Sequence, residues 1–205
     1  MAGDFEDYLT DAKLNINTTG RNDDFSDTHF YPYEATGYTV LKRLADTDLI
    51  LASDCLLDYG SGKGRVPIYL NYITGCSSIG VEMMNEFYMD SLLNLSYYGK
   101  TFKDKASNIT FIQYPAQKYD VPAKVNRIFF FNPFSVEIFK SVLKRIMESY
   151  YDEPRHIFLF FYYPQDEYVA HLAGIDEIFF YDEIDCRDNF PENDDRNKVL
   201  IYEIL

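Results

Sequence analysis

The stretch LLDYGSGKGRVPIYL, residues 56–70, decides which fold the sequence predicts. An apolar run reaches Asp58, and Gly60, Gly62 and Gly64 then follow within five residues. Beyond the glycines, apolar side chains recur at helical spacing. Glycines between a buried strand and a helix let a ligand approach the backbone, because no side chain stands in the way. The stretch therefore predicts a ligand-binding turn at the carboxyl end of a strand.

The rest of the chain alternates between strand and helix patterns, which argues for a parallel sheet with helices on both faces. The last two predicted strands are joined only by a polar loop. Parallel neighbours need a long crossover, so this pair must be antiparallel. We expect helices over 36–45, 64–74, 85–98, 135–150 and 165–173, and strands over 55–59, 77–82, 108–114, 125–132, 156–163, 176–185 and 197–205.

Composition limits the class of protein. The chain has 205 residues, enough for one domain with a real core, and its 33 acidic and 19 basic residues give a net charge of -14. Such an excess repels phosphate backbones, and Lys and Arg never cluster beyond pairs, which makes a nucleic-acid partner less favoured. Cys55, Cys76 and Cys186 lack the spacing of a disulfide framework or a zinc site. With no signal-peptide pattern and no apolar run of about 18–20 residues, we expect a cytoplasmic protein without a membrane partner.

Three kinds of ligand use glycine turns of this sort. The nucleotide phosphate loop needs Gly-x-x-x-x-Gly-Lys-Ser/Thr, which the sequence lacks. The dinucleotide fingerprint Gly-x-Gly-x-x-Gly fails because Gly64 comes one residue too early. A third type fits better, because Asp58 precedes the turn and Glu82 ends the next strand, 20 residues after Gly62. Glu82 can accept hydrogen bonds from a ribose diol, and a sulfonium ligand with an amino-acid tail suits Asp58.

With these residues, LLDYGSGKGR…SIGVE resembles the first two motifs of the class I S-adenosylmethionine-dependent methyltransferases, over roughly residues 30–205. The resemblance implies a three-layer α-β-α Rossmann-like fold. Its seven-stranded, mostly parallel sheet has the order 3-2-1-4-5-7-6 and an antiparallel terminal strand. We expect residues 36–205 to form this single domain and residues 1–35 to form an N-terminal helix with a lid or substrate segment.

The same resemblance implies a site for S-adenosylmethionine, with S-adenosylhomocysteine as the product. In that site Gly60, Ser61 and Gly62 line the methionine part of the cofactor. Asp58 helps to hold its amino group, and Glu82 binds the ribose hydroxyls.

Adenine recognition follows the family less closely. Met83 is expected to cover one face of the adenine. Many family members carry an acidic residue after the third strand, but here the sequence is FIQYPAQKYD, residues 111–120. Gln113, Tyr114 and Ala116 occupy that region, and backbone groups or Gln117 remain alternatives for binding the adenine.

A second motif, Asn132-Pro133-Phe134, closes the fourth strand of the predicted sheet. Family members place the residues nearest the transferred methyl there, so Asn132 is a candidate catalytic and cofactor-binding residue. Amino-group methyltransferases of nucleic acids carry Asn/Asp-Pro-Pro-Tyr/Phe at this point, whereas this chain has a single proline. The motif is equally compatible with a strand-to-helix turn in which Ser135 caps the helix.

The segment before the first strand, HFYPYEATGYTVL, corresponds to the part of the family that folds over the cofactor. Tyr31, Tyr33 and Thr36 are therefore candidate lid residues, although core packing and a helix cap at Thr36 would explain them as well. The histidines show neither metal-ligand nor triad spacing, so we predict no metal: His29, His156 and His171.

The sequence thus predicts an S-adenosylmethionine-dependent methyltransferase that moves a methyl group in line to a nucleophile on an acceptor. A small molecule or a protein is the favoured acceptor. Two alternatives stay open. One is an RNA or DNA amino-group methyltransferase that uses Asn132-Pro133-Phe134. The other is a donor-binding or NAD-type nucleotide-binding protein without methyl transfer. No motif indicates the acceptor or the oligomeric state.

Overall fold

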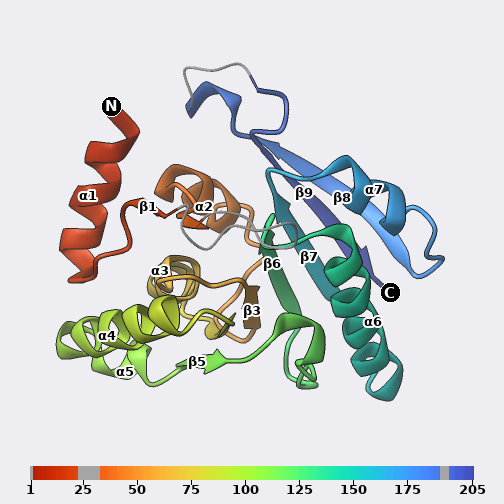
Figure 1. Ribbon diagram of the computed structural model, residues 1–205, viewed down its shortest axis with the longest axis horizontal. Coiled ribbons are helices and arrows are strands. Elements are labelled where there is room, and N and C mark those ends of the chain that lie inside the picture. Colours follow the sequence, from red (N-terminus) through yellow and green to blue (C-terminus); the bar gives the residue numbers. More distant parts are fainter. Residues whose placement is uncertain (1, 23–32, 190–193) are drawn as a thin grey trace.

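A seven-stranded sheet forms the centre of the protein, as a computed structural model that describes residues 2–22, 33–189 and 194–205 shows (Figure 1). Two short strands precede this sheet along the chain, so counting only within the sheet gives the order 3-2-1-4-5-7-6, as predicted. From one edge to the other the strands are β5 (Ile109–Gln113), β4 (Ser77–Glu82), β3 (Cys55–Tyr59), β6 (Arg127–Phe131), β7 (Ile157–Tyr162), β9 (Lys198–Ile204) and β8 (Ile178–Asp185).

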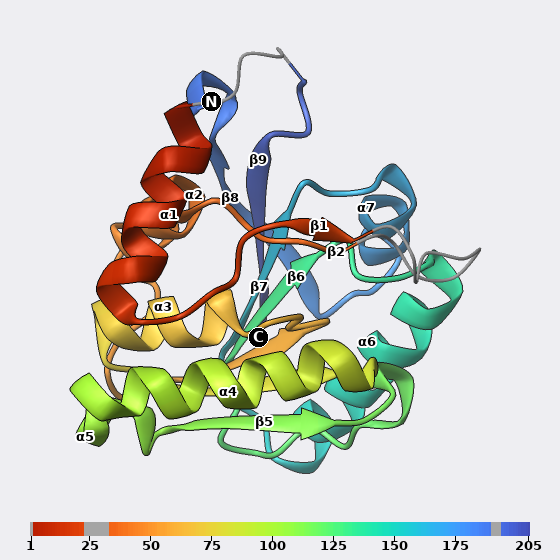
Figure 2. The ribbon, with the colours of Figure 1, turned by 60° about the vertical axis from the view of Figure 1, so that its left-hand side comes forward.

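Helices cover both faces of the sheet, which gives the predicted three layers (Figures 1 and 2). The central strands β3 and β7 are buried along their whole length, and their apolar runs are what a strand covered on both faces requires. One core cluster lies under α6 (Val136–Asp152) and α7 (Asp166–Leu172). The other contains residues of α2 (Tyr38–Ala45), α3 (Arg65–Thr74) and α4 (Asn85–Thr101). The remaining helices in the described ranges are α1 (Ala2–Leu14), the short α5 (Lys103–Ala106) and two 3-10 turns, Ala116–Lys118 and Arg187–Asn189.

The chain ends in the predicted hairpin. β9 is antiparallel to both of its neighbours, β7 and β8, while the other neighbouring strands are parallel. Because β3, β4 and β6 run in the same direction, their carboxyl ends meet at one edge of the sheet. Asp58, Glu82 and Asn132 lie at those ends.

The N-terminal part holds more structure than the sequence indicated. A two-stranded antiparallel sheet, β1 (Arg21–Asn22) with β2 (Tyr33–Glu34), lies where we expected only a loop. Thr36 is not the helix cap that the sequence allowed as an alternative, because α2 begins at Tyr38 with Gly37 in the N-cap position. Within the described ranges, no helix is long and apolar enough to cross a membrane.

Candidate functional site

The glycine turn is fixed by hydrogen bonds to the neighbouring strand β4. The amides of Gly60 and Ser61 donate to the Val81 carbonyl at 2.9 and 3.1 Å, and the Gly62 amide donates to Glu82 Oε2 at 2.9 Å. Gly60, Gly62 and Gly64 have φ angles of 73°, 51° and 89°. Residues other than glycine rarely adopt such positive values. The turn therefore folds back over the end of β4 and brings Glu82 beneath it.

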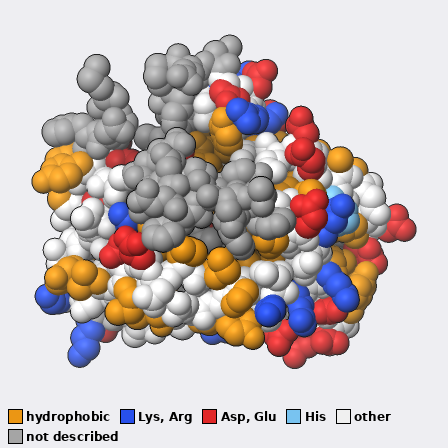
Figure 3. Space-filling view, viewed as in Figure 1, with side chains coloured by type: hydrophobic (Ala, Val, Ile, Leu, Met, Phe, Trp, Pro, Cys, Tyr) orange, Lys and Arg blue, Asp and Glu red, His pale blue; other side chains and the backbone are white. Residues whose placement is uncertain are grey.

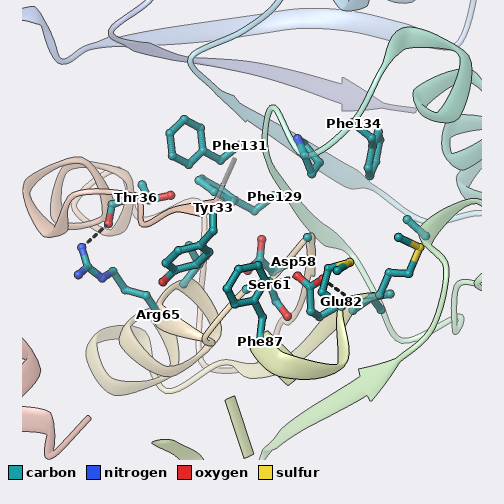
Figure 4. A pocket seen from close by; sticks show the side chains of 18 of the residues that line it. Tyr33, Thr36, Asp58, Ser61, Arg65, Glu82, Phe87, Phe129, Phe131 and Phe134 are labelled. Atoms are coloured by element: carbon teal, nitrogen blue, oxygen red, sulfur yellow. Dashed lines mark hydrogen bonds between the residues drawn. The ribbon is translucent and has the colours of Figure 1, made fainter. Parts of the chain in front are cut away.

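A cavity opens beside this turn, at the carboxyl ends of β3, β4 and β6 (Figure 4). Ten of the eleven predicted site residues line it: Tyr33, Thr36, Asp58, Gly60, Ser61, Gly62, Glu82, Met83, Ala116 and Asn132. Gln113 is the exception, because it is exposed at the end of β5 and lies outside the lining. Tyr31 and His29 fall outside the described residues.

Two buried carboxylates dominate the electrostatics of the cavity. Asp58 is 3% exposed and Glu82 is 8% exposed. Burial, with the nearby charge of Glu82, raises the pKa of Asp58 well above its usual value. Burial also raises the pKa of Glu82, against the opposing effect of the backbone amides of Met84 and Gly62. The structure records no hydrogen bond to the Asp58 carboxylate within its described part. This group is therefore available to a hydrogen-bond donor of a ligand in the cavity.

Ser61 supplies a second unused polar group. Ser61 lines the cavity, and its hydroxyl is buried with no hydrogen-bond partner among the residues described. A buried hydroxyl without a partner is costly, which is why such groups are usually paired. Together with Asp58 and Glu82, Ser61 makes a set of acceptors that fits a ligand bearing an ammonium group and hydroxyls.

Asn132 sits in an unusual backbone conformation at the end of β6, with a φ of 39°. Its side-chain Nδ2 donates to the carbonyl of Tyr163, which follows β7 and also has a positive φ, of 52°. A carbonyl can only accept, so it fixes which way the carboxamide is turned. Oδ1 is left as the acceptor of a side chain that lines the cavity.

Two of the glycines are required by contacts within the protein itself. A Cβ atom at Gly60 would lie 2.6 Å from Cβ of Pro133, and one at Gly62 would overlap the ring of Tyr33. The glycine turn thus makes room for the end of β6 and for Tyr33, where the sequence had suggested room for a ligand alone.

Aromatic side chains form the walls of the cavity, and the sequence analysis missed most of them. The Tyr33 ring lies 4.8 Å from that of Phe87, centroid to centroid, and the walls include Phe129, Phe131 and Phe134 (Figure 4). Residues two apart on a strand point to the same side, and Phe129 and Phe131 of β6 both line the cavity. Tyr114 also lines the cavity.

Arg65, another missed residue, is a cation in the cavity lining and is 3% exposed. Its position directly after the glycine turn, at the first residue of α3, was the available signal. The two described histidines lie elsewhere: His156 pairs with Glu203 at 2.9 Å, and His171 packs on Phe139. The described ranges contain no group of His, Cys, Asp and Glu suited to a metal ion.

Known proteins resemble this chain in structure. No protein-family model and no curated protein matches its sequence. An RNA methyltransferase from Salinibacter ruber, in complex with S-adenosyl-L-homocysteine, is similar with a TM-score of 0.56 and 15% identity over 83% of this chain and 94% of that one.

Two further structures cover most of the chain. The human methyltransferase 10 domain containing protein has a TM-score of 0.60 and 10% identity over 98% of this chain and 95% of that one. A protein in the NADB-Rossmann superfamily from Streptococcus agalactiae has a TM-score of 0.61 and 18% identity over 84% of this chain and 69% of that one. At such identities the similarity concerns the fold.

Proposed function

We propose, from the class I S-adenosylmethionine-dependent methyltransferase fold that this chain shares with those structures, that it binds S-adenosylmethionine and transfers its methyl group. The observation that carries the proposal is the set of unused acceptors at the glycine turn. Asp58 and Ser61 are buried without partners in the described part of the chain, and Glu82 lies beside them. These groups suit the ammonium and the ribose hydroxyls of that cofactor.

Each acceptor would have a defined partner. The Asp58 carboxylate would hold the ammonium group in a charge-assisted hydrogen bond, which is about twice as strong as a neutral one. Glu82 already accepts the amides of Gly62 and Met84, at 2.9 and 2.8 Å, and its remaining lone pairs would accept the ribose hydroxyls. Met83 and Ala116, which also line the cavity, would contact the adenine.

The cofactor supplies a methyl group on a positively charged sulfur, which an acceptor nucleophile attacks in line. Such a transfer needs alignment and the exclusion of water more than proton transfer. Phe129, Phe131 and Phe134 line the cavity and would keep water away from the methyl group. Asn132, held by Tyr163, would orient the acceptor through Oδ1.

We favour a small molecule or a protein side chain as the acceptor, because the net charge of -14 repels nucleic acids. An RNA or DNA amino group is the second candidate. It is supported by Asn132-Pro133-Phe134 at the cavity and by the RNA methyltransferase among the similar structures. A donor-binding or NAD-type protein without methyl transfer is the third.

Methyl transfer can be tested directly with radiolabelled S-adenosylmethionine. A cell extract would be divided into small-molecule, protein and RNA fractions, and each fraction would be incubated with the wild-type protein or with Asp58→Asn. We expect label to enter the small-molecule or protein fraction with the wild-type protein only. Label in RNA would support the second candidate. Equal labelling by both proteins, or none in any fraction, would count against the proposal.

A further inference from the structure

A buried arginine joins the cavity to the N-terminal segment. Arg65 Nε donates to Thr18 Oγ1 at 2.6 Å, Nη1 donates to the Thr36 carbonyl at 3.1 Å, and Nη1 also pairs with the Asp7 carboxylate. Three points on the N-terminal segment therefore converge on one guanidinium. Burying a charge is costly unless it is paired, so separating this group from its partners is unfavourable.

A second layer of contacts fixes these partners. Asp11, which is buried in α1, accepts the Thr18 amide at 2.6 Å and the Thr18 hydroxyl at 2.8 Å. Asp11 also accepts the hydroxyl of Tyr38, whose ring lies 4.4 Å from the Arg65 guanidinium carbon. The contacts join α1, the loop after it, and the start of α2 to the first residue of α3.

The residues held in this way form one wall of the cavity. Tyr33 donates its hydroxyl to the Thr18 carbonyl at 2.7 Å, and its ring covers Gly62. Lys63 Nζ donates to the Thr19 carbonyl at 3.2 Å and lies 5.1 Å from the Tyr33 ring centroid. Residues 33–36 all line the cavity, and Figure 4 shows Thr36 bonded to Arg65 beside Tyr33.

We propose that Arg65 is a positioning residue for cofactor binding, which holds residues 33–36 in place over the glycine turn through Asp7, Thr18 and Thr36. The inference rests on the proposed function for its ligand. Without Arg65, residues 33–36 would lie in place over the glycine turn for only a fraction of the time. The apparent dissociation constant of the cofactor would then rise in inverse proportion to that fraction.

Arg65 itself lines the cavity, so it could instead bind the carboxylate of the cofactor directly. The variant Asp7→Asn separates the two roles. Asp7 lies outside the cavity lining, and its loss weakens the hold on the segment while it leaves the guanidinium in place. A positioning role predicts weaker binding in this variant, whereas a direct contact predicts unchanged or tighter binding.

The experiment compares Arg65→Lys and Asp7→Asn with a matched control, Arg127→Lys. Arg127 is also a buried arginine, paired with Asp54 at 3.2 Å, but it begins β6 at the end of the sheet opposite the cavity. Calorimetry would give the dissociation constant of S-adenosylhomocysteine. Hydrogen exchange without ligand would follow the amides of residues 15–20 and 33–36.

We expect the dissociation constant to rise about tenfold or more in both test variants and less than about twofold in the control. We also expect faster exchange in those two segments of the test variants, while the amides of β3 stay protected. Wild-type affinity in both test variants would overturn the inference, as would a loss confined to Arg65→Lys or unchanged exchange. If the wild-type protein itself fails to bind S-adenosylhomocysteine, the proposed function falls, and exchange still decides whether Arg65 holds the segment.

Discussion

Among single residues, Glu82 has two tasks. It anchors the glycine turn through the amide of Gly62, and it presents its other lone pairs to the cavity. We expect Glu82→Ala to weaken the binding of S-adenosylhomocysteine by about 1.5–3 kcal/mol, the usual cost of losing hydrogen bonds to a charged group. Calorimetry measures this. Gln113→Ala at the end of the next strand, β5, should bind normally because Gln113 lies outside the cavity. An unaffected Glu82→Ala would show that Glu82 does not bind the ribose.

The conformation of Gly62 can be separated from its contact with Tyr33. In Gly62→Ala a methyl group would overlap the Tyr33 ring, and the backbone has a φ of 51°. Gly20→Ala is the matched control, since Gly20 has a φ of 100° but nothing within 4 Å of an added Cβ. Thermal unfolding and calorimetry of both variants test this. We expect both to lose stability and only Gly62→Ala to lose affinity for S-adenosylhomocysteine. Equal effects on affinity would mean that the Tyr33 contact is irrelevant to binding.

Asp58 makes stability depend on pH in a defined direction. Its pKa is raised in the folded protein, so above its unfolded value of about 3.9 the folded state holds more protons than the unfolded state. By linkage, the stability of the unliganded protein then falls as pH rises through that window. Denaturant titrations at several pH values should show a shallower fall in Asp58→Asn, which gains stability relative to the wild type as pH increases. Parallel curves for the two proteins would show that Asp58 does not titrate as described.

At the scale of elements, β6 carries three consecutive phenylalanines, Phe129–Phe131. Phe130 is fully buried, stacks on Tyr59 and Phe161 at 5.5 and 4.9 Å, and does not line the cavity. We expect Phe130→Ala to lower the free energy of unfolding by about 3–5 kcal/mol, because it leaves a void among aromatic rings. Phe179 on the edge strand β8 is 48% exposed, and Phe179→Ala should change stability by less than about 0.5 kcal/mol.

Urea titration of both variants gives these values. The affinity of folded Phe130→Ala for S-adenosylhomocysteine should match that of the wild type. A loss of affinity as large as in Glu82→Ala would show that the β6 core and the cavity are coupled.

The elements most visible in the sequence were those whose pattern follows from burial. The apolar runs of β3, β6 and β7 indicated strands that are covered on both faces. The apolar stripe of α6 indicated a helix with one buried face, because burial of one face repeats at the helical period. The short strands β1 and β2 could not be predicted, because two residues cannot show a period. The terminal hairpin was predictable because its connection is a polar loop with no helix pattern that could serve as a crossover.

The candidate site was predictable where backbone geometry or strand ends decide its members, as for Gly60, Asp58 and Glu82. The sequence analysis placed Gln113 in the site, whereas the structure leaves it exposed at the end of β5 and outside the cavity lining. Arg65 was missed because its partners Asp7 and Thr18 lie more than 40 residues away in the sequence. Contacts between residues so far apart in the chain leave no recognisable motif in the sequence. That residues 1–35 act as a lid stays a prediction.

For the whole molecule, the net charge of -14 bears on the acceptor. Lys and Arg side chains lie among Asp and Glu side chains on the face shown in Figure 3. Non-specific affinity for nucleic acid comes from basic contacts with phosphates. We therefore expect no binding at micromolar concentrations in filter titrations with total RNA and duplex DNA at about 50 mM salt. Micromolar or tighter binding that falls steeply with added salt would favour the nucleic-acid alternative.

The central claim is that the cavity holds a cofactor with an ammonium group and a ribose, and no dinucleotide. Calorimetric titration of the wild-type protein with S-adenosylhomocysteine and, separately, with NAD tests it most directly. We expect one molecule of S-adenosylhomocysteine to bind per chain and NAD to give no signal, because Gly64 comes too early for the dinucleotide turn and Asp58 lines the cavity as a carboxyl that can pair with an ammonium group. Tighter binding of NAD than of S-adenosylhomocysteine, or no binding of S-adenosylhomocysteine at all, would contradict the claim.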